Sequence, residues 1–292
     1  MTSNLTARIA VAAIAIPAIL WISSQGGIWL FGLVSLLALV ATYEFLSNEG
    51  HSMAGPLFWL AIAAIVSSLL LTVTAIPFGH TNPFQSHNDS PFFFALGAVV
   101  LIFFLLTGIL LALGKQTPSE LFSTHARLTW GVTYLALLYP FVYALGNDAT
   151  LAWKITPATG GDLLWLLYAI LWVGDTAAMG IGGWLGRHQL APGVSPRKTV
   201  EGFLGGVVGS LCAAALVYIW KFNHLQFLHI IVLALGCSVV GQLGDLVESM
   251  WKRSLGIKDS SNLIPGHGGV LDRFDSLLFA APFMYVYIWY YL

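Results

Sequence analysis

The chain has 292 residues, of which 58% are hydrophobic and only 9% are charged, and its formal net charge at pH 7 is −1. Ordinary globular domains have roughly 25% charged residues, so this chain has too little polar surface to be a water-soluble protein, and its near-zero net charge gives no signal for a nucleic-acid partner. The two cysteines lie in apolar segments without the spacing of a metal site.

Apolar segments long enough to cross a bilayer recur along the whole chain. A spanning helix needs about 20 mostly apolar residues, and a backbone in lipid must satisfy its own hydrogen bonds, which leaves helices or closed barrels. Continuous runs of this length exclude a barrel, whose strands alternate. We therefore predict an all-α polytopic integral membrane protein with about nine transmembrane helices, eight remaining open because the first segment is short. The predicted spans are residues 6–22, 27–46, 57–77, 92–113, 128–146, 162–183, 200–220, 226–244 and 271–291, the eighth with a polar extension.

The first spans carry few polar residues. The run before Gly27 has the look of a signal peptide, but the next apolar run follows too soon, so we expect a retained helix. Glu44 lies near the inner end of the second span, where a carboxylate is expected to be hydrated. These observations predict that residues 1–160 form a scaffold of helices or a lipid-facing part.

Lysine and arginine residues gather in alternate loops. Cytoplasmic loops of membrane proteins carry an excess of these residues. Under the nine-helix count, Lys154 and Lys221 fall on one side and all the others on the opposite side, which we predict to be cytoplasmic, with the N-terminus inside and the C-terminus outside. The residues of that side are Arg8, Lys115, Arg127, Arg187, Arg197, Lys198, Lys252, Arg253, Lys258 and Arg273.

The sequence becomes rich in glycine from about residue 160. The pairs Gly202/Gly206 and Gly205/Gly209 have the small-xxx-small spacing that lets helices pack closely. Asp175 lies deep in the predicted span 162–183, where an ionisable residue normally faces a wet cavity or a partner. We interpret Asp175 as functional, with a structural hydrogen bond as the alternative.

The segment SPRKTVEG, residues 195–202, follows this span. Arg197 and Lys198 can bind phosphate, while Ser195, Thr199 and Glu201 can form hydrogen bonds with a base or a sugar. Ser195 before Pro196 also predicts the N-terminus of a helix, where free N–H groups favour an anion. The alternative is a loop whose cations only fix the topology.

Residues 241–275, GQLGDLVESMWKRSLGIKDSSNLIPGHGGVLDRFD, concentrate the charged residues of the chain. Asp245 and Glu248 are three positions apart, as are Asp272 and Asp275, so each pair would project from one helix face. Such carboxylates repel each other unless a cation or protons neutralise them, and oxygen ligands favour Mg²⁺. We expect Asp245, Asp272 and Asp275 to bind the metal. The role of Glu248 stays open, and a structural salt-bridge network is the alternative.

The basic residues and glycines between these carboxylates complete a set suited to phosphoryl-transfer chemistry. They are Lys252, Arg253 and Lys258, followed by the Gly-Gly run after His267. We expect His267 to contact phosphate or to anchor the loop rather than to act as a general base.

The segment SMWKRSLGIKDSSNLIPGHGGVLDRFD resembles the C-terminal signature of the CDP-diacylglycerol synthases (phosphatidate cytidylyltransferases). Trp251 stands where that family usually has an aliphatic residue or Phe, and the GDT at 174–176 and SPRKTVEG also resemble family elements, so the resemblance covers roughly residues 170 to 275. The matching signature residues are Ser249, Lys252, Arg253, Lys258, Asp259, Pro265, His267, Gly268, Gly269, Asp272, Arg273 and Asp275.

The resemblance implies transfer of a cytidylyl group from CTP to phosphatidate, which gives CDP-diacylglycerol and pyrophosphate for phospholipid biosynthesis. It implies Mg²⁺ as cofactor, with a second cation suggested, and leaves a homodimer open. It places the site in residues 161–292 of a bacterial inner-membrane protein, facing the cytoplasm, where CTP is found. Lys252, Arg253, Lys258 and His267 would hold lipid phosphate or pyrophosphate beside the metal-binding Asp245, Asp272 and Asp275. The expected substrate-binding residues are Asp175, Ser195, Arg197, Lys198, Thr199, Glu201, Asp259, Gly268 and Gly269.

Two other functions fit parts of the pattern. A transporter also places buried acids and basic loops along its pathway, but its polar residues would be distributed through both halves, whereas here they cluster late in the chain. An enzyme that transfers the phosphoalcohol part of a CDP-alcohol, or a sugar phosphate, would share the metal and carboxylates but not the spacing of the signature.

Overall fold

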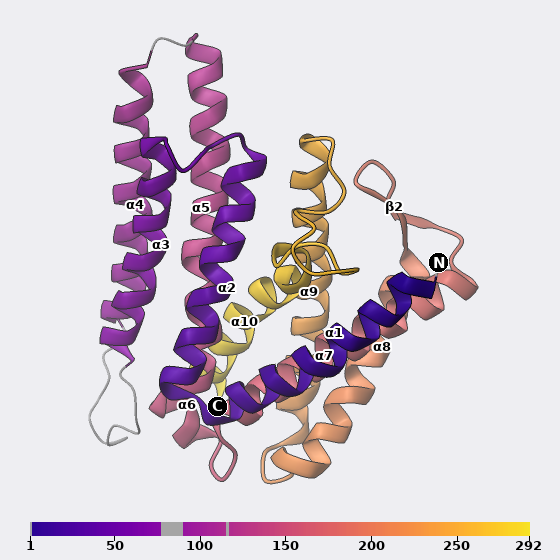
Figure 1. The fold of residues 1–292 in the computed structure, drawn as a ribbon. Coiled ribbons are helices and arrows are strands. Elements are labelled where there is room, and N and C mark those ends of the chain that lie inside the picture. The colour runs from indigo at the N-terminus through magenta and orange to yellow at the C-terminus, as the bar shows by residue number, and fades with distance from the viewer. Residues whose placement is uncertain (1, 77–89, 115–116) are drawn as a thin grey trace.

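The computed structural model of the protein describes residues 2–76, 90–114 and 117–292. In this part of the chain a long helix is present at each of the nine predicted positions, which confirms the all-α architecture (Figure 1). The long helices are α1 (Thr2–Gln25), α2 (Gly27–Asn48), α3 (Pro56–Ala75), α4 (Ser90–Ala112), α5 (Pro118–Asn147), α7 (Gly160–Leu185), α8 (Val200–Val217), α9 (Phe227–Ser254) and α10 (Leu271–Tyr291).

Seven of the described helices, α2–α5 and α7–α9, are long and apolar enough to cross a membrane. The apolar segment of α1, Ile9–Gln25, is shorter, and α10 is not among the seven. The eighth predicted span has the expected polar extension, because α9 continues to Ser254. The protein is therefore a multi-pass membrane protein.

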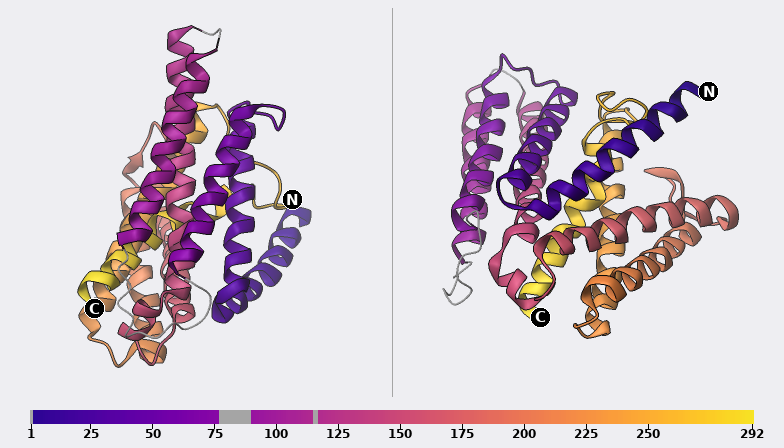
Figure 2. Two further views of the ribbon diagram at one scale, coloured as in Figure 1. Left: turned by 90° about the vertical axis from the view of Figure 1, so that its left-hand side faces the viewer. Right: turned by 60° about the horizontal axis from the view of Figure 1, so that its bottom comes forward.

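The helices form an upright group and an inclined group. Helices α2, α3, α4 and α5 stand beside one another, whereas α7 and α8 lie together at an angle to them (Figure 1). Helix α1 leaves α2 at the Gly26–Gly27 turn and runs obliquely away from the upright group (Figure 2). Helix α10 begins in the middle of the molecule and packs against both α9 and α5.

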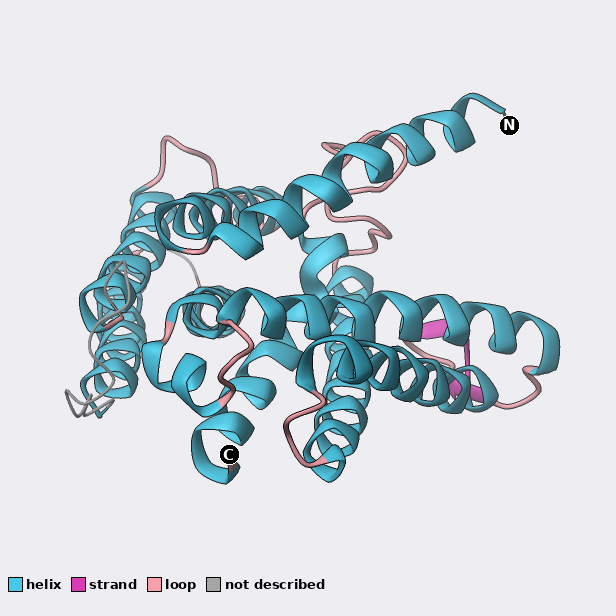
Figure 3. Cartoon of the chain, turned by 90° about the horizontal axis from the view of Figure 1, so that it is seen from below, coloured by secondary structure: helices cyan, strands magenta, loops and turns pink. Residues whose placement is uncertain are grey.

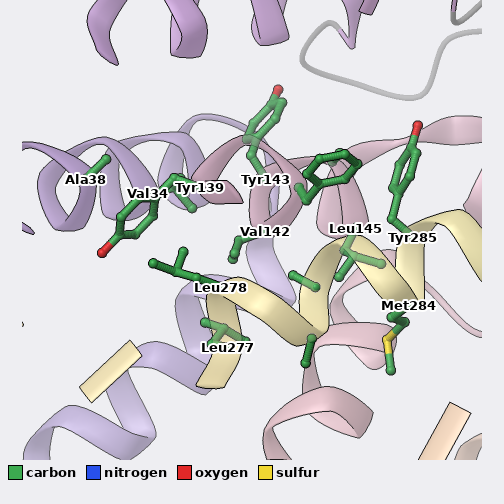
Figure 4. Packing of buried hydrophobic residues seen from close by; sticks show 14 of the residues in the cluster. Val34, Ala38, Tyr139, Val142, Tyr143, Leu145, Leu277, Leu278, Met284 and Tyr285 are labelled. Carbon is green, nitrogen blue, oxygen red and sulfur yellow. The ribbon is translucent and has the colours of Figure 1, made fainter. Parts of the chain in front are cut away.

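Part of the buried hydrophobic core lies where α10 meets α5 and α2 (Figure 4). Tyr139, Tyr143 and Tyr285 are almost completely buried there. The hydroxyl of Tyr285 donates to Asp148 Oδ2 at 2.6 Å, which satisfies its polar end. These contacts join the last helix of the chain to the first half of the protein.

Helices α7 and α8 approach each other closely because glycine lines their contact. A Cβ atom at residue 205 would lie 2.6 Å from Ile181 Cδ1, and one at residue 209 would lie 2.5 Å from the Cβ of Ala177. Only a hydrogen atom fits at these positions. The close packing predicted from the small-xxx-small spacing is therefore confirmed.

A short hairpin connects α7 to α8 (Figure 3). Its strands are β1 (Gln189–Ala191) and β2 (Ser195–Thr199), which pair in antiparallel fashion. The predicted helix start at Ser195–Pro196 is wrong: α8 begins at Val200, and Thr199 caps it by accepting a 3.1 Å hydrogen bond from the N–H of Gly202. The N-cap function therefore belongs to a threonine four residues later.

The lysines that were predicted to lie apart from the other basic residues, Lys154 and Lys221, belong to elements at one end of the described molecule. The hairpin and the C-terminal end of α9 lie toward one end, and the small helix α6 (Ala149–Lys154) and the π-helix η1 (Tyr218–Phe222) lie at the other (Figure 1). At that second end, Lys154 donates to the carbonyl of Trp289 at 2.6 Å, and Lys221 lies 3.0 Å from Asp162 Oδ1. The side chain of Arg8 and all of Lys115 lie outside the described residues.

Candidate active site

A cavity of about 1010 Å³ lies between α1, α2, α7 and the ends of α9 and α10. Much of its lining is apolar, with residues such as Ala15 and Ile19 of α1 and Leu171 and Trp172 of α7. The rest of its lining is strongly polar. The predicted site residues that line the cavity are Asp175, Arg197, Lys198, Thr199, Asp245, Lys252, Asp259, His267, Asp272 and Asp275.

Three carboxylates meet at the polar end of this cavity and form what we call the carboxylate trio: Asp245 and Asp275, which line the cavity, and Glu248, which lies behind them outside its described lining. One oxygen of each lies within 4.8 Å of the others. Asp245 and Glu248 project from one face of α9, and Asp275 faces them from the first turns of α10. The spacing therefore brings Asp245 and Asp275 together as predicted, with Glu248 as a third member.

The trio suits a hard divalent cation. Glu248 is 1% exposed, and its Oε1 has no hydrogen-bond donor among the residues that the structure describes. Asp275 is 8% exposed, and its Oδ1 accepts a hydrogen bond from the backbone N–H of Ser276. Buried carboxylate oxygens that face one another repel, and an oxygen-seeking ion such as Mg²⁺ removes that repulsion.

Two lysines lie at the edge of the trio. The Nζ of Lys198 lies 2.6 Å from Asp245 Oδ2, and the Nζ of Lys252 lies 2.5 Å from Glu248 Oε2 and 2.6 Å from Asp272 Oδ1. The three carboxylates of the trio and that of Asp272 carry four formal negative charges when ionised. The ammonium groups of Lys198 and Lys252 carry two positive charges, so two formal negative charges are left in this cluster. A divalent cation would balance them.

Asp272 does not join the trio. Its Oδ1 faces Lys252, and its Oδ2 accepts hydrogen bonds from the backbone N–H groups of Ser260 and Gly269, both at 2.8 Å, and from Ser260 Oγ at 3.0 Å. Its side chain therefore holds the loop between α9 and α10 against the start of α10.

The Gly-Gly run lets this loop come close to Asp272. Gly268 has a φ of +84°, a conformation that L side chains rarely adopt. A Cβ at residue 269 would lie 2.0 Å from Ser260 Oγ. The predicted contact of Gly268 and Gly269 with substrate stays a prediction, since neither residue is part of the cavity lining as described.

Four other predicted residues lie beside the cavity rather than in its described lining. Ser195 pairs with Ala191 in the hairpin. Glu201 closes the base of the hairpin, with Oε1 2.6 Å from Nδ1 of His188 and Oε2 accepting from two backbone N–H groups. The remaining two are Arg253 and Lys258.

Arg253 joins the hairpin to the end of α9. Its side chain donates to the carbonyls of Val194 at 3.2 Å and Ile257 at 2.8 Å. Lys258 is exposed. Their predicted contacts with phosphate stay predictions.

The sequence did not reveal the environment of Glu44, on α2. The expectation of a hydrated carboxylate is wrong: the residue is 3% exposed and accepts hydrogen bonds from the loop after α9 and from the start of α10. The available signal was a single carboxylate within an apolar span, which is the same signal that singled out Asp175.

Comparison with known proteins gives a consistent result. Residues 6–291 match the sequence profile of the Cytidylyltransferase family. The chain is 33% identical over 279 residues to a phosphatidate cytidylyltransferase of Staphylococcus haemolyticus, and the alignment covers 95% of this chain and 96% of the relative. It is 32% identical over 280 residues to the phosphatidate cytidylyltransferase of Staphylococcus aureus strain COL, with the same coverage of both chains.

Proposed function

This chain belongs to the Cytidylyltransferase family, and from that premise we propose that it transfers the cytidylyl group of CTP to phosphatidate, with formation of CDP-diacylglycerol and pyrophosphate. It is an enzyme, and its relatives carry the name phosphatidate cytidylyltransferase over nearly the whole chain. The proposal goes further than the family in assigning the chemistry to particular residues.

The observation that carries the proposal is the carboxylate trio, two of whose members, Asp245 and Asp275, line the polar end of a largely apolar cavity. A reaction between a nucleotide and a lipid needs both environments in one site. The lining from α1 and α7 suits acyl chains, and the acidic and basic residues at the other end suit a metal-bound triphosphate. The phosphate group of the lipid would lie at the boundary between them.

The chemistry requires little acid–base catalysis. A phosphate oxygen of phosphatidate would form a bond to the α-phosphorus of CTP, while the bond from that phosphorus to the bridging oxygen of pyrophosphate breaks and its electrons leave with pyrophosphate. The attacking oxygen is already anionic, so no strong base is needed. The protein would contribute mainly alignment of the reacting groups and neutralisation of charge.

Asp245, Glu248 and Asp275 would hold Mg²⁺, which supplies charge neutralisation at the phosphates when it is bound. The N–H groups and side chains around Asp272 would keep the loop of His267 in place. Lys198 and Arg197, at the hairpin, would bind phosphate oxygens of the nucleotide, with Asp175 nearby in the same cavity. The second cation remains an expectation from the family resemblance.

We propose further that the site faces the cytoplasm of a bacterial cell membrane. The predicted excess of Lys and Arg supports this orientation, since the hairpin and the C-terminal end of α9, which carry Arg197, Lys198, Lys252 and Arg253, lie at the opposite end of the described molecule from α6 and η1, which carry Lys154 and Lys221. CTP is made in the cytoplasm, and an opening on that side gives the nucleotide direct access.

The test is product formation by purified protein in mixed micelles. Labelled CTP, Mg²⁺ and phosphatidate should give labelled CDP-diacylglycerol and an equal amount of pyrophosphate. Omission of phosphatidate or chelation of Mg²⁺ should stop both. Unchanged CTP in the complete mixture, with protein shown to be folded, would contradict the proposal.

A further inference from the structure

The carboxylate of Glu44, on α2, lies at the start of α10, 226 positions away in the sequence from Val270. Its Oε1 accepts hydrogen bonds from Ser261 Oγ at 2.6 Å and from the N–H of Val270 at 2.9 Å. Its Oε2 accepts from Ser260 Oγ at 3.2 Å and from the N–H of Leu271 at 3.0 Å. Each oxygen therefore has one backbone donor and one hydroxyl within hydrogen-bond distance, although the single hydroxyl hydrogen of Ser260 is shared with Asp272 Oδ2 at 3.0 Å.

The backbone donors belong to the helix that carries Asp275. The first N–H groups of a helix have no acceptor within the helix, and the side chain of the N-cap residue usually supplies one. The N-cap of α10 is Val270, whose side chain cannot accept a hydrogen bond. Glu44 supplies the acceptors from another helix, and its negative charge suits the positive end of the α10 dipole.

The same end of α2 also holds the loop before α10. Asn48 lies one turn after Glu44, and its Nδ2 donates to the carbonyl of Ser260 at 2.7 Å. Ser260 in turn contacts Asp272 through its hydroxyl and its N–H. A Cβ at residue 269 would lie 2.6 Å from Glu44 Oε1, so glycine is needed there for the loop to come this close. Helix α2 thus fixes both the loop and the start of α10.

We propose that Glu44 is a positioning residue that sets the place of Asp275 and thereby the affinity of the carboxylate trio for its divalent cation, an inference that rests on the proposed role of the trio. Asp275 lies one turn after Leu271, whose N–H Glu44 accepts. A shift of this first turn moves Asp275 relative to Asp245 and Glu248, which are fixed on α9. Glu44 acts through α10, since the described lining of the cavity does not include it.

The substitution Glu44→Gln tests this inference at almost constant volume. One carboxylate oxygen becomes an NH₂ group, which is a donor facing a backbone N–H and a hydroxyl, so the start of α10 loses an acceptor. A Mn²⁺ titration of the purified full-length protein, monitored by EPR in the absence of substrates, measures the affinity of the trio for a divalent cation independently of turnover. We expect the Mn²⁺ dissociation constant to rise about 10- to 100-fold, the usual effect of losing a group that orients metal ligands.

In turnover assays of Glu44→Gln, the Mg²⁺ concentration that gives half-maximal pyrophosphate release should rise by the same factor as the Mn²⁺ dissociation constant. The value of kcat should recover at excess Mg²⁺. A merely structural role would lower the amount of active protein equally at all Mg²⁺ concentrations. The matched control is Thr42→Val, on the same helix and also buried, whose hydroxyl donates to Ala38 O within α2. We expect it to bind Mn²⁺ as the wild type does.

Ser261→Ala serves as a second variant in case Glu44→Gln does not fold. It removes one of the four donors and leaves Glu44 in place, so a smaller rise in the Mn²⁺ dissociation constant, roughly 2- to 10-fold, is expected. Wild-type Mn²⁺ affinity in folded protein carrying either substitution overturns the inference about Glu44. Absence of pyrophosphate release from the wild type would instead overturn the proposed function and leave the Mn²⁺ comparison valid.

Discussion

Lys198 and Asp245 form an ion pair, with 2.6 Å between Nζ and Oδ2, although Lys198 belongs to the hairpin and Asp245 to α9. Both side chains remain partly exposed, at 27% and 33%, and both line the cavity. The pair therefore brings a basic group of the hairpin to the edge of the carboxylate trio. A triphosphate bound at the trio would lie within reach of this ammonium group.

Lys198→Met should weaken nucleotide use more than lipid use. Loss of one charged hydrogen bond to phosphate is expected to lower kcat/KM for CTP about 10- to 100-fold, mainly through KM, with a much smaller change in KM for phosphatidate. Initial rates of pyrophosphate release at varied CTP and varied phosphatidate measure this difference. Lys221→Met is the matched control, because Lys221 also pairs with one carboxylate but lies at the opposite end of the molecule. Equal effects of the two substitutions would contradict the assignment.

Asp245→Asn and Asp275→Asn should each remove most of the Mg²⁺-dependent activity. Each replaces a charged oxygen of the trio by an amide, and loss of one such electrostatic group is expected to lower turnover by at least about 100-fold. Mn²⁺ titration by EPR should show the loss of binding in the same variants. EDTA should inactivate the wild type, and Mg²⁺ should restore it.

Asp162→Asn is the control for the trio, since Asp162 is a carboxylate at the first turn of α7 with its own lysine partner. Its substitution should leave Mn²⁺ binding unchanged. Asp245→Asn or Asp275→Asn protein that binds Mn²⁺ with wild-type affinity would show that the trio is not the metal site.

The helices could be predicted from the sequence because lipid leaves few choices to an apolar backbone. Runs of about 20 apolar residues are sufficient to locate spanning helices, and the seven described helices α2–α5 and α7–α9 follow that rule. The approach of Asp245 and Asp275 was also predictable, since the polar ends of α9 and α10 are consecutive in the chain and flank the single loop of residues 255–270. Only the pairing of these residues, and not their detailed geometry, follows from spacing.

Other features depend on contacts that sequence spacing does not contain. Asp272 and Asp275 are one turn apart, yet Asp272 turns to the loop because Lys252 and two backbone N–H groups reach its oxygens. Strand β2, before α8, pairs with β1, which has only three residues, Gln189–Ala191. A strand of this length is too short to show the alternation of polar and apolar residues by which strands are predicted. Glu44 is satisfied by donors more than 200 positions away, and no local pattern indicates them.

Lys252→Met should destabilise the protein strongly. Lys252 is 8% exposed and its Nζ contacts both Glu248 and Asp272, so its loss leaves two buried carboxylates without a cation. Removal of one partner from a buried ion pair typically lowers the free energy of unfolding by about 3–5 kcal/mol. Unfolding in mixed micelles, followed by circular dichroism against an added denaturing detergent, measures the change.

Lys258→Met is the control for that measurement, because Lys258 is exposed in the same signature segment. A substitution at an exposed position should change the free energy of unfolding by no more than about 0.5 kcal/mol. If the two variants unfold at the same detergent concentration, the ion pairs of Lys252 do not hold the loop in place.

Gly205→Ala should separate α7 from α8 and thereby affect the site at a distance. The added Cβ would lie 2.6 Å from Ile181 Cδ1 and 2.7 Å from Ile181 Cβ. Because a Cβ atom is bonded directly to the helix backbone, it cannot move aside as the far end of a flexible side chain can. Overpacking of this kind lowers the free energy of unfolding by about 1–3 kcal/mol. Because α7 also carries Asp175, displacement of α7 should lower turnover in the protein that remains folded.

Gly180→Ala isolates the effect of packing from that of helix propensity. Gly180 also lies on α7, outside the described cavity lining, but a Cβ there would meet no atom within 4 Å. The same substitution should therefore leave stability unchanged or raise it slightly, since alanine favours helix more than glycine. Unfolding of both variants in the same micelles, together with their rates of pyrophosphate release, makes the comparison. A Gly205→Ala protein as stable and active as Gly180→Ala would mean that α7 and α8 do not need glycine to approach, and that the position of Asp175 does not depend on their contact.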